Sequence, residues 1–286
     1  EHKNKLYLGT NQGLYVQSSV DGTLELVEGS NGQVWKVSQV GETLFCCHNR
    51  GLFVINDMRL IPLDCTDGVW DVTSLTDSTA IVGTYVGFYY LTLTHGKWQM
   101  QHLQGFDETV LYYEIDALGN IWILTSRGLE RLSVNLNTRK VTSELILKQA
   151  KAPRIYSLTK WKNRILITSD EYCATVDTSG QFSTDISILD NLAGKHRYLN
   201  LTEDIHKNLW YIYDNRIAVR AYDSMSHSLK KENIVLYNSS LLIDGFSNIM
   251  PSRDAGVVIG GVDGFYRIYS SNHQPKRKEN IYIRRV

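Results

Sequence analysis

The sequence lacks several features that would assign it to a class. No stretch approaches the roughly 18 consecutive apolar residues that a membrane-spanning helix needs. The 286-residue chain carries 30 Lys and Arg residues against 30 Asp and Glu residues, so it has no electrostatic basis for binding nucleic acid or an anionic membrane. The N-terminus has no apolar signal-peptide segment, and we expect the chain to be either cytosolic or an excised piece of a longer protein.

Cysteine and proline are also scarce, with 4 residues of each. The cysteines form no Cys-x-x-C pair, which argues against a zinc knuckle or a redox dithiol. Cys46 and Cys47 are adjacent within an apolar run, so on a strand they point to opposite faces and cannot readily bond each other. We interpret the cysteines as small buried hydrophobic residues.

The motifs of common catalytic sites are missing as well. The sequence contains no Gly-x-Ser-x-Gly, His-Glu-x-x-His or Gly-Lys-Ser/Thr motif. None of its 8 histidines forms the close pair that metal sites favour, so we predict no metal ligand and no cofactor. Five carboxylates could in principle pair as in glycosidases, although turn capping and solvation explain them more simply: Asp67, Asp71, Asp107, Glu108 and Glu114. We therefore predict no catalytic residue.

What the sequence does contain is a repeat rich in β-forming residues. A unit of three or four apolar residues, a short gap, and a glycine followed by an apolar residue recurs at a spacing of roughly 40–50 residues, which is typical of a β-propeller. In the fifth and sixth copies Tyr172 and Arg216 stand in place of the glycine, so their turns need another geometry. The seven copies lie at residues 6–16, 44–54, 80–90, 121–131, 165–175, 209–219 and 257–267.

Each copy is interpreted as a β-hairpin that follows an apolar inner strand and precedes a more polar outer strand. Four strands per unit predict an all-β, seven-bladed β-propeller of four-stranded blades. We expect the propeller to span residues 1–272, and residues 273–286 to form a tail leading toward a following domain. No inner strand precedes Leu6, so the first blade is expected to be incomplete. Either the tail fills that gap or, as we favour, residues upstream of Glu1 do so.

Within the repeat, residues 119–129 carry a specific pattern, Gly-Asn-Ile-Trp-Ile-Leu-Thr-Ser-Arg-Gly-Leu, with Asp116 ahead of it. This pattern resembles the two-component-regulator propeller repeat, and Asp204 with residues 207–210 forms a second copy. The resemblance implies the periplasmic sensor region of a hybrid two-component system, in which propellers are followed by an Ig-like domain, a transmembrane helix and a histidine kinase. It also implies a periplasmic location, with the full-length protein anchored in the inner membrane.

The starts of the inner strands are the expected ligand-binding face, because loops from every blade converge there. Aromatic rings at this rim could stack on sugar rings, while Arg and Asn side chains could bind hydroxyl or acidic groups. Taken singly, Trp35, Trp70 and Tyr112 could instead pack as core between blades. The candidate ligand-binding residues are Trp35, Trp70, Tyr112, Arg154, Tyr156, Arg197, Tyr198 and Asn248.

These observations favour a non-catalytic sensor propeller that binds an oligosaccharide or sugar-derived ligand and controls a histidine kinase elsewhere in the chain. A homodimer is expected in the full-length receptor. One alternative is a structural or dimerisation propeller that mediates protein–protein contacts. The other is a glycan-cleaving propeller enzyme. Binding without product release distinguishes the first hypothesis from the last.

Overall fold

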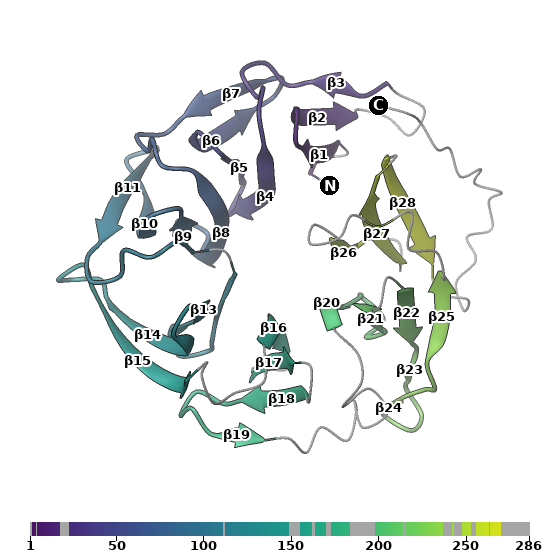
Figure 1. Ribbon diagram of the computed structural model, residues 1–286. Helices are drawn as coiled ribbons and strands as arrows, with labels where there is room; N and C mark the ends of the chain where they lie inside the picture. Colours follow the sequence, from purple (N-terminus) through teal and green to yellow (C-terminus); the bar gives the residue numbers. More distant parts are fainter. Residues whose placement is uncertain are drawn as a thin grey trace. The chain divides into compact units, whose positions relative to one another are not determined.

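The structure is a computed structural model. It describes residues 2–3, 5–17, 23–110, 112–148, 155–161, 164–169, 173–183, 198–213, 216–236, 242, 248–252, 256–262 and 264–269, with the backbone alone at residues 155–156, 161, 169, 173 and 198–200. Every regular element in these residues is a β-strand (Figure 1). The chain divides into two compact units, residues 1–147 and residues 148–286.

The first unit contains four antiparallel sheets in chain order. The first sheet comprises β1 (Leu6–Thr10), β2 (Gly13–Gln17) and β3 (Glu25–Leu26). The second comprises β4 (Val34–Val40), β5 (Thr43–His48), β6 (Gly51–Asn56) and β7 (Arg59–Pro62). The third comprises β8 (Val69–Thr76), β9 (Thr79–Thr84), β10 (Gly87–Thr94) and β11 (Lys97–Leu103). The fourth comprises β12 (Tyr113–Ile115), β13 (Ile121–Thr125), β14 (Gly128–Asn135) and β15 (Lys140–Lys148).

The second unit contains three further sheets of the same kind. The fifth comprises β16 (Ile155–Trp161), β17 (Arg164–Ser169), β18 (Cys173–Val176) and β19 (Phe182–Ser183). The sixth comprises β20 (Tyr198–Glu203), β21 (Leu209–Tyr213), β22 (Arg216–Arg220) and β25 (Asn233–Leu236), with a small hairpin of β23 (Tyr222–Asp223) and β24 (Ser228–Leu229) inserted before β25. The last comprises β26 (Ile249–Pro251), β27 (Gly256–Gly261) and β28 (Gly264–Tyr269).

Seven meandering sheets in succession confirm the predicted all-β, seven-bladed β-propeller of four-stranded blades. Five sheets have four described strands, and the first and last sheets have three. The prediction that the propeller ends at residue 272 stays a prediction. The tail at residues 273–286, and with it the question of what completes the first blade, lies outside the described residues.

The core of each unit lies between successive blades. The second strand of a blade is buried on both faces, which explains its continuous apolar sequence: β9 and β21 are buried almost throughout. One cluster joins the second and third blades through Phe45, Leu52 and Val82, among other residues. Cys47 is fully buried in this cluster and Cys46 in the cluster between the first and second blades, as predicted, whereas Cys65 is only partly buried and the side chain of Cys173 lies outside the described part of the structure.

The repeat glycines permit the tight turns between the second and third strands. Gly51 has a φ of 134°, a conformation that residues with a Cβ atom rarely adopt. A Cβ atom on Gly51 would also lie 2.2 Å from the carbonyl oxygen of Cys65, in the segment that leads to the next blade. Glycine is therefore required here both by the turn and by the close approach of the backbone.

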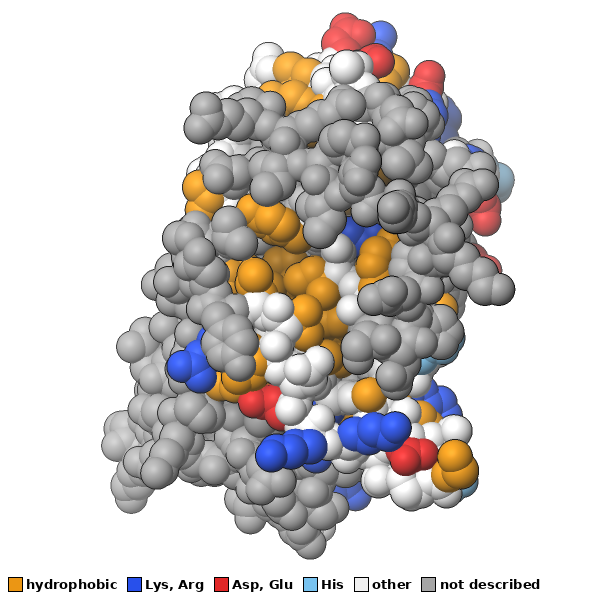
Figure 2. Space-filling model, turned by 90° about the vertical axis from the view of Figure 1, so that its right-hand side faces the viewer, with side chains coloured by type: hydrophobic (Ala, Val, Ile, Leu, Met, Phe, Trp, Pro, Cys, Tyr) orange, Lys and Arg blue, Asp and Glu red, His pale blue; other side chains and the backbone are white. Residues whose placement is uncertain are grey.

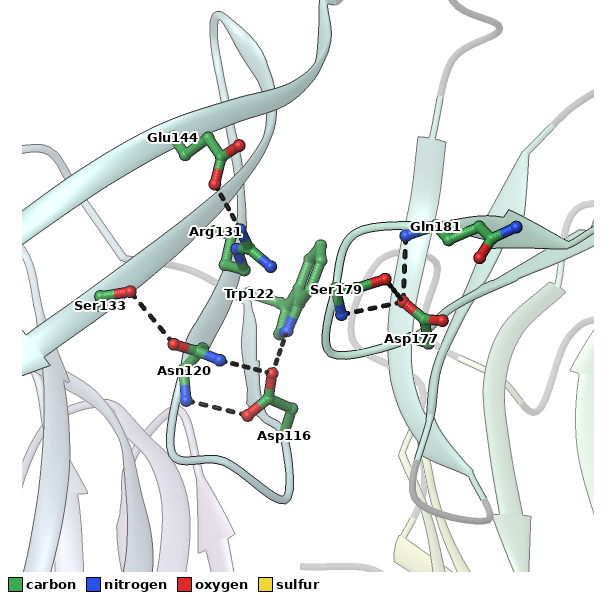
Figure 3. Close-up of polar contacts among 9 residues, drawn as sticks. All are labelled: Asp116, Asn120, Trp122, Arg131, Ser133, Glu144, Asp177, Ser179 and Gln181. Atoms are coloured by element: carbon green, nitrogen blue, oxygen red, sulfur yellow. Dashed lines mark hydrogen bonds and ion pairs between the residues drawn. The ribbon is translucent and has the colours of Figure 1, made fainter.

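The Asp-Gly-Asn-Trp pattern of the repeat forms a hydrogen-bonded turn between β12 and β13 (Figure 3). Asp116 Oδ1 accepts hydrogen bonds from the backbone N–H groups of Leu118 and Asn120, each at 2.9 Å. Its Oδ2 accepts from Asn120 Nδ2 and from the indole Nε1 of the buried Trp122, each at 3.0 Å. The residues that carry the family resemblance thus fix a turn and orient a core tryptophan.

The same arrangement recurs between β20–β21 in the second unit. Asp204 accepts from the backbone N–H of Asn208, from its side-chain amide and from Trp210 Nε1. Asp177 makes a simpler version between β18 and β19, in which it accepts from Ser179 and Gln181 but from no tryptophan that the structure describes. The acidic position of the repeat is therefore structural.

Figure 2 shows hydrophobic side chains on one face of the molecule. Apolar atoms contribute much of the accessible surface of most folded proteins, so this view alone identifies no binding surface.

Candidate ligand-binding site

Three aromatic residues meet at the starts of the inner strands of the second and third blades. Trp35 of β4 and Trp70 of β8 have ring centroids 4.2 Å apart, and Tyr85, in the turn between β9 and β10, lies 5.0 Å from Trp70. The indole Nε1 of Trp35 donates a hydrogen bond to Tyr85 Oη at 3.0 Å. Trp70 Nε1 is buried and has no hydrogen-bond partner among the described residues. Trp35, Trp70 and Tyr85 form what we call the aromatic cluster.

Two hydrogen bonds to the backbone of Tyr85 hold this residue in position. Its N–H donates to the carbonyl oxygen of Gly68 at 2.9 Å, and its carbonyl oxygen accepts from Thr109 Oγ1 at 2.9 Å. A Cβ atom on Gly68 would come 2.5 Å from the Tyr85 ring, so glycine allows the ring to lie against the chain just before Trp70.

Each tryptophan of the cluster lies at a β-bulge and is followed in the sequence by a charged residue. The pairing of β4 with β5 skips Trp35 between Val34 and Lys36, and the pairing of β8 with β9 skips Trp70 between Val69 and Asp71. Regular strands alternate between faces, whereas a bulge adds a residue and redirects side chains locally. Accordingly both members of each pair are partly or fully accessible, while Val34 and Val69 are buried.

The inner strands β4, β8 and β12 line an open groove of about 390 Å³, whose lining includes Lys36 and Asp71, the residues that follow Trp35 and Trp70. Its polar side chains include Lys36 and Ser38 from β4, Asp71 and Thr73 from β8, and Glu114 from β12. Three successive blades of the first unit therefore contribute to one concave surface.

An ion pair crosses this groove. Lys36 Nζ lies 2.7 Å from Asp71 Oδ2, and Ser38 Oγ donates a weaker hydrogen bond to Asp71 Oδ1 at 3.4 Å. Burial opposes the charged form of Lys36, but the attraction of Asp71 and the hydrogen bond to it outweigh burial and raise the pKa of Lys36 above its usual value. The side chain of Asp71 is only 18% exposed, against 48% for Lys36, so the carboxylate is a fixed part of the wall.

Tyr113 closes one side of the groove as a neutral residue. Its hydroxyl donates to the carbonyl oxygen of Ile81 at 3.0 Å. Burial first, and the nearby carboxylate of Asp71 second, raise the pKa of Tyr113 well above the usual value for a phenol. The groove therefore offers acceptors on Asp71 and Glu114, and donors on Lys36 and the hydroxyl side chains.

The structure brings together two of the predicted ligand-binding residues, Trp35 and Trp70. Tyr112 is 60% exposed immediately before β12, and no contact with the cluster is observed. Asn248 is exposed before β26 in the second unit. Arg154 and Arg197 lie outside the described residues, and only the backbone of Tyr156 and Tyr198 is described, within β16 and β20.

Sequence reasoning missed Tyr85 and Lys36. A signal for Tyr85 was present, since the corresponding turns of three other copies carry polar residues, namely Asn11, Asn49 and Ser126. An aromatic residue at the tip of a two-residue turn needs a packing or binding reason. Lys36 had no comparable signal, because its importance depends on the Asp71 partner from the next blade.

The other carboxylates singled out from the sequence have separate partners. Asp67 accepts a hydrogen bond from Tyr89 Oη at 2.9 Å, and Glu108 pairs with Arg127 at 3.2 Å. Asp107 lies 3.9 Å from His102. Across the described residues, no group of three or more His, Cys, Asp and Glu side chains could hold a metal ion.

No protein-family model matches the sequence, and no curated protein matches it. Solved structures do match in fold. The extracellular domain of the hybrid two-component system BT4673 from B. thetaiotaomicron superposes with a TM-score of 0.64 over 93% of this chain at 17% identity. This chain spans 36% of that domain's length.

Two other solved structures are also similar. YCF48 bound to a D1 peptide has a TM-score of 0.64 over 94% of this chain and 90% of its own, at 16% identity. Virginiamycin B lyase from Staphylococcus aureus has a TM-score of 0.55 over 94% of this chain and 86% of its own, at 14% identity. At these identities the likeness establishes the propeller fold. In the described part of the chain, no helix has the length and apolar character that crossing a membrane requires.

Proposed function

We propose that this chain is the extracytoplasmic sensor propeller of a hybrid two-component receptor. The observation that supports this most directly is the fold likeness to the extracellular domain of such a system, together with the repeat pattern around Asp116 and Asp204. The longer protein would contain the membrane anchor and histidine kinase, and the chain would act by binding rather than by catalysis.

The ligand we propose is an oligosaccharide bound at the aromatic cluster and the adjoining groove. Indole rings present the flat apolar surface on which sugar C–H faces stack. The groove adds fixed polar groups of both kinds, Asp71 as an acceptor and Lys36 as a donor, which sugar hydroxyls can engage together. Binding at inner strands of adjacent blades would couple their relative arrangement to ligand occupancy.

Isothermal titration of the purified chain with a panel of oligosaccharides tests this function. Trp35→Leu should weaken the binding of any oligosaccharide that titrates by about tenfold, the upper range for an aromatic stacking contact. Trp98→Leu is the matched control. Like Trp35, Trp98 is a partly buried tryptophan whose indole donates a hydrogen bond, here to Thr43, and whose ring packs against another aromatic ring, here that of Phe45. It lies on the outer strand β11 and should leave binding unchanged.

Two results would contradict the proposal. If Trp35→Leu and Trp98→Leu had equal effects, the ligand would bind elsewhere. If the chain cleaved the oligosaccharide during titration, as monitored by mass spectrometry, the glycan-cleaving alternative would replace the sensor. In the full-length receptor, the same oligosaccharide should change kinase autophosphorylation, and Trp35→Leu should remove that response.

A further inference from the structure

The ion pair between Lys36 and Asp71 joins two successive blades and carries no net charge. Lys36 lies in β4 and Asp71 in β8, and the Nζ–Oδ2 distance is 2.7 Å. Burial opposes the charge of Lys36, but the attraction of Asp71 and the hydrogen bond to it outweigh burial and raise the pKa of Lys36 above its usual value. Because the two opposite charges lie so close together, the pair as a whole attracts neither cations nor anions at longer range.

Both members of the pair retain hydrogen-bonding capacity. A lysine ammonium has three N–H donors, and Asp71 accepts from one of them in the part of the chain that the structure describes. The Asp71 carboxylate offers about four lone-pair sites, and it accepts from Lys36 on Oδ2 and from Ser38 on Oδ1. Since the Lys36 side chain is about half exposed and that of Asp71 is partly exposed, a ligand in the groove can reach both groups.

The spacing of the pair matches a common feature of sugars. A donor and an acceptor that lie one hydrogen-bond length apart can engage two ligand groups at a similar separation. Neighbouring hydroxyl oxygens of a sugar ring in the gauche arrangement meet this condition, since one can accept from Lys36 while the other donates to Asp71. Ser38 and Thr73 add neutral hydroxyl groups to the same lining, and a hydroxyl both donates and accepts.

A charged ligand group is disfavoured at this pair whichever sign it carries. An ammonium group that approaches Asp71 also approaches the positive charge of Lys36, and a carboxylate that approaches Lys36 meets the negative charge of Asp71. A group that displaced Lys36 would leave the mostly buried Asp71 with a ligand in place of its fixed partner, and breaking a buried ion pair is costly. Hydroxyl groups bind to both members without breaking the pair.

We propose that the groove selects neutral sugars through two neighbouring hydroxyl groups, one accepting a hydrogen bond from Lys36 Nζ and the other donating to a carboxylate oxygen of Asp71. The sugar ring that carries them lies against the aromatic cluster. This inference rests on the proposed function, in which the ligand is an oligosaccharide, and adds the class of sugar that the site prefers.

Titration with four tetrasaccharides of glucose-type rings joined by the same linkage tests this preference. The probes are a glucose tetramer, a glucosamine tetramer with an ammonium group on each ring, a glucuronate tetramer with a carboxylate on each ring, and a fully O-methylated glucose tetramer, which accepts hydrogen bonds but donates none. The glucose tetramer should bind most tightly. The methylated tetramer should bind more weakly, because it leaves Asp71 without a donor.

Two variants shift the preference in opposite directions. Lys36→Met leaves the Asp71 charge without its partner and should raise the affinity for the glucosamine tetramer relative to the glucose tetramer by about two- to fivefold, as expected for a partly exposed ion pair. Asp71→Asn leaves the Lys36 charge instead and should favour the glucuronate tetramer by about the same factor. The remaining charged residue of the lining, Glu114, is the same in both variants, so these changes report the pair.

Lys5→Met is the matched control. It removes the lysine of another ion pair of the first unit, with Asp57, and neither residue lines the groove. The preferences should stay as in the wild type. Equal binding of all four tetramers, or preferences that Lys36→Met and Asp71→Asn leave unchanged, would overturn the inference. Circular dichroism of each variant checks that the fold is retained.

The outcomes also separate this inference from the proposed function. If all four tetramers bind equally and Trp35→Leu weakens each of them, the function stands and the selection of neutral sugars is wrong. If no tetramer binds but sorbitol, an open-chain polyol with neighbouring hydroxyl groups, titrates in a manner sensitive to Lys36→Met, the hydroxyl site stands and the oligosaccharide ligand is wrong. If neither the tetramers nor sorbitol bind at millimolar concentration, both are wrong.

Discussion

Replacing Asp116 with alanine removes the centre of the turn between β12 and β13. The carboxylate accepts four hydrogen bonds, two from backbone N–H groups and two from the side chains of Asn120 and Trp122. Trp122 is fully buried, so its indole N–H cannot turn to water when its acceptor is lost. The change therefore acts on the core as well as on the turn.

The magnitude follows from these contacts. An unsatisfied buried indole N–H costs about 1–3 kcal/mol, and losing the backbone bonds to a charged acceptor adds about 1 kcal/mol. Asp116→Ala should thus lower the free energy of unfolding by about 2–4 kcal/mol, measured by urea denaturation. Hydrogen exchange should accelerate first at the amides of Leu118 and Asn120. Asp116→Asn should lose less, because its remaining carbonyl oxygen still accepts from the backbone.

The pH dependence of this loss provides a second readout. Burial would raise the pKa of Asp116, but hydrogen bonds from Trp122, Asn120 and the backbone outweigh burial and hold it below the usual 3.8. The stability contributed by the carboxylate is therefore present above 3.8 and is lost as the pH falls through the lowered pKa. The difference between wild type and Asp116→Ala should shrink over that window.

Asp177→Ala is the control for the turn alone. Asp177 caps a similar turn but lies at the surface and bonds Ser179 and Gln181 instead of a buried indole. Its replacement should cost clearly less than that of Asp116. Equal losses for the two variants, or unchanged exchange at Leu118 and Asn120, would refute the idea that the repeat aspartate stabilises the blade through the core tryptophan.

Three further changes test other parts of the structure. Burial lowers the pKa of His48 below its usual 6.5, so the folded state favours the neutral imidazole. The stability of the protein should therefore fall as the pH drops below 6.5, and His48→Gln should remove this pH dependence of the melting temperature. Gly51→Ala should cost about 2 kcal/mol or more because of its positive φ and the 2.2 Å approach to Cys65, whereas Gly96→Ala, with open space around it, should cost about 1 kcal/mol. Trp70→Phe should cost less than about 1 kcal/mol, because it removes a buried N–H that lacks a partner, and a loss above about 2 kcal/mol would contradict that assignment.

The architecture was predictable because the same short sequence pattern recurs in successive copies of the repeat. An apolar run, a turn glycine and an apolar return strand define a hairpin, and seven copies at a propeller spacing define the blades. Gly51 shows why glycine is needed at this turn, since its positive φ and its close approach to the backbone of Cys65 both exclude a side chain. The inserted hairpin β23–β24 was not predicted, because its short strands carry no apolar alternation.

The candidate site was predictable only in part. Trp35 and Trp70 stood out as aromatic residues at equivalent positions of successive inner strands. Their contact, and the pairing of Lys36 with Asp71, depends on two blades lying side by side at a given register. A bulge also breaks the two-residue period on which strand predictions depend, so the accessible faces of Lys36 and Asp71 could not be assigned from alternation.

The bulges have a consequence for how such a scaffold can change over time. In a regular strand, side chains alternate between the accessible face and the packed interior, so both neighbours of an accessible residue are buried. Inserting one residue would move every later side chain to the opposite face. A residue at a β-bulge is not part of this alternation. Four first strands carry one at the same place, at Trp35, Trp70, Tyr156 and Leu199. At Trp35 and Trp70, whose side chains are partly exposed, the sequence can therefore diversify by single substitutions while the interior sequence stays fixed, so that one fold can acquire new specificities blade by blade.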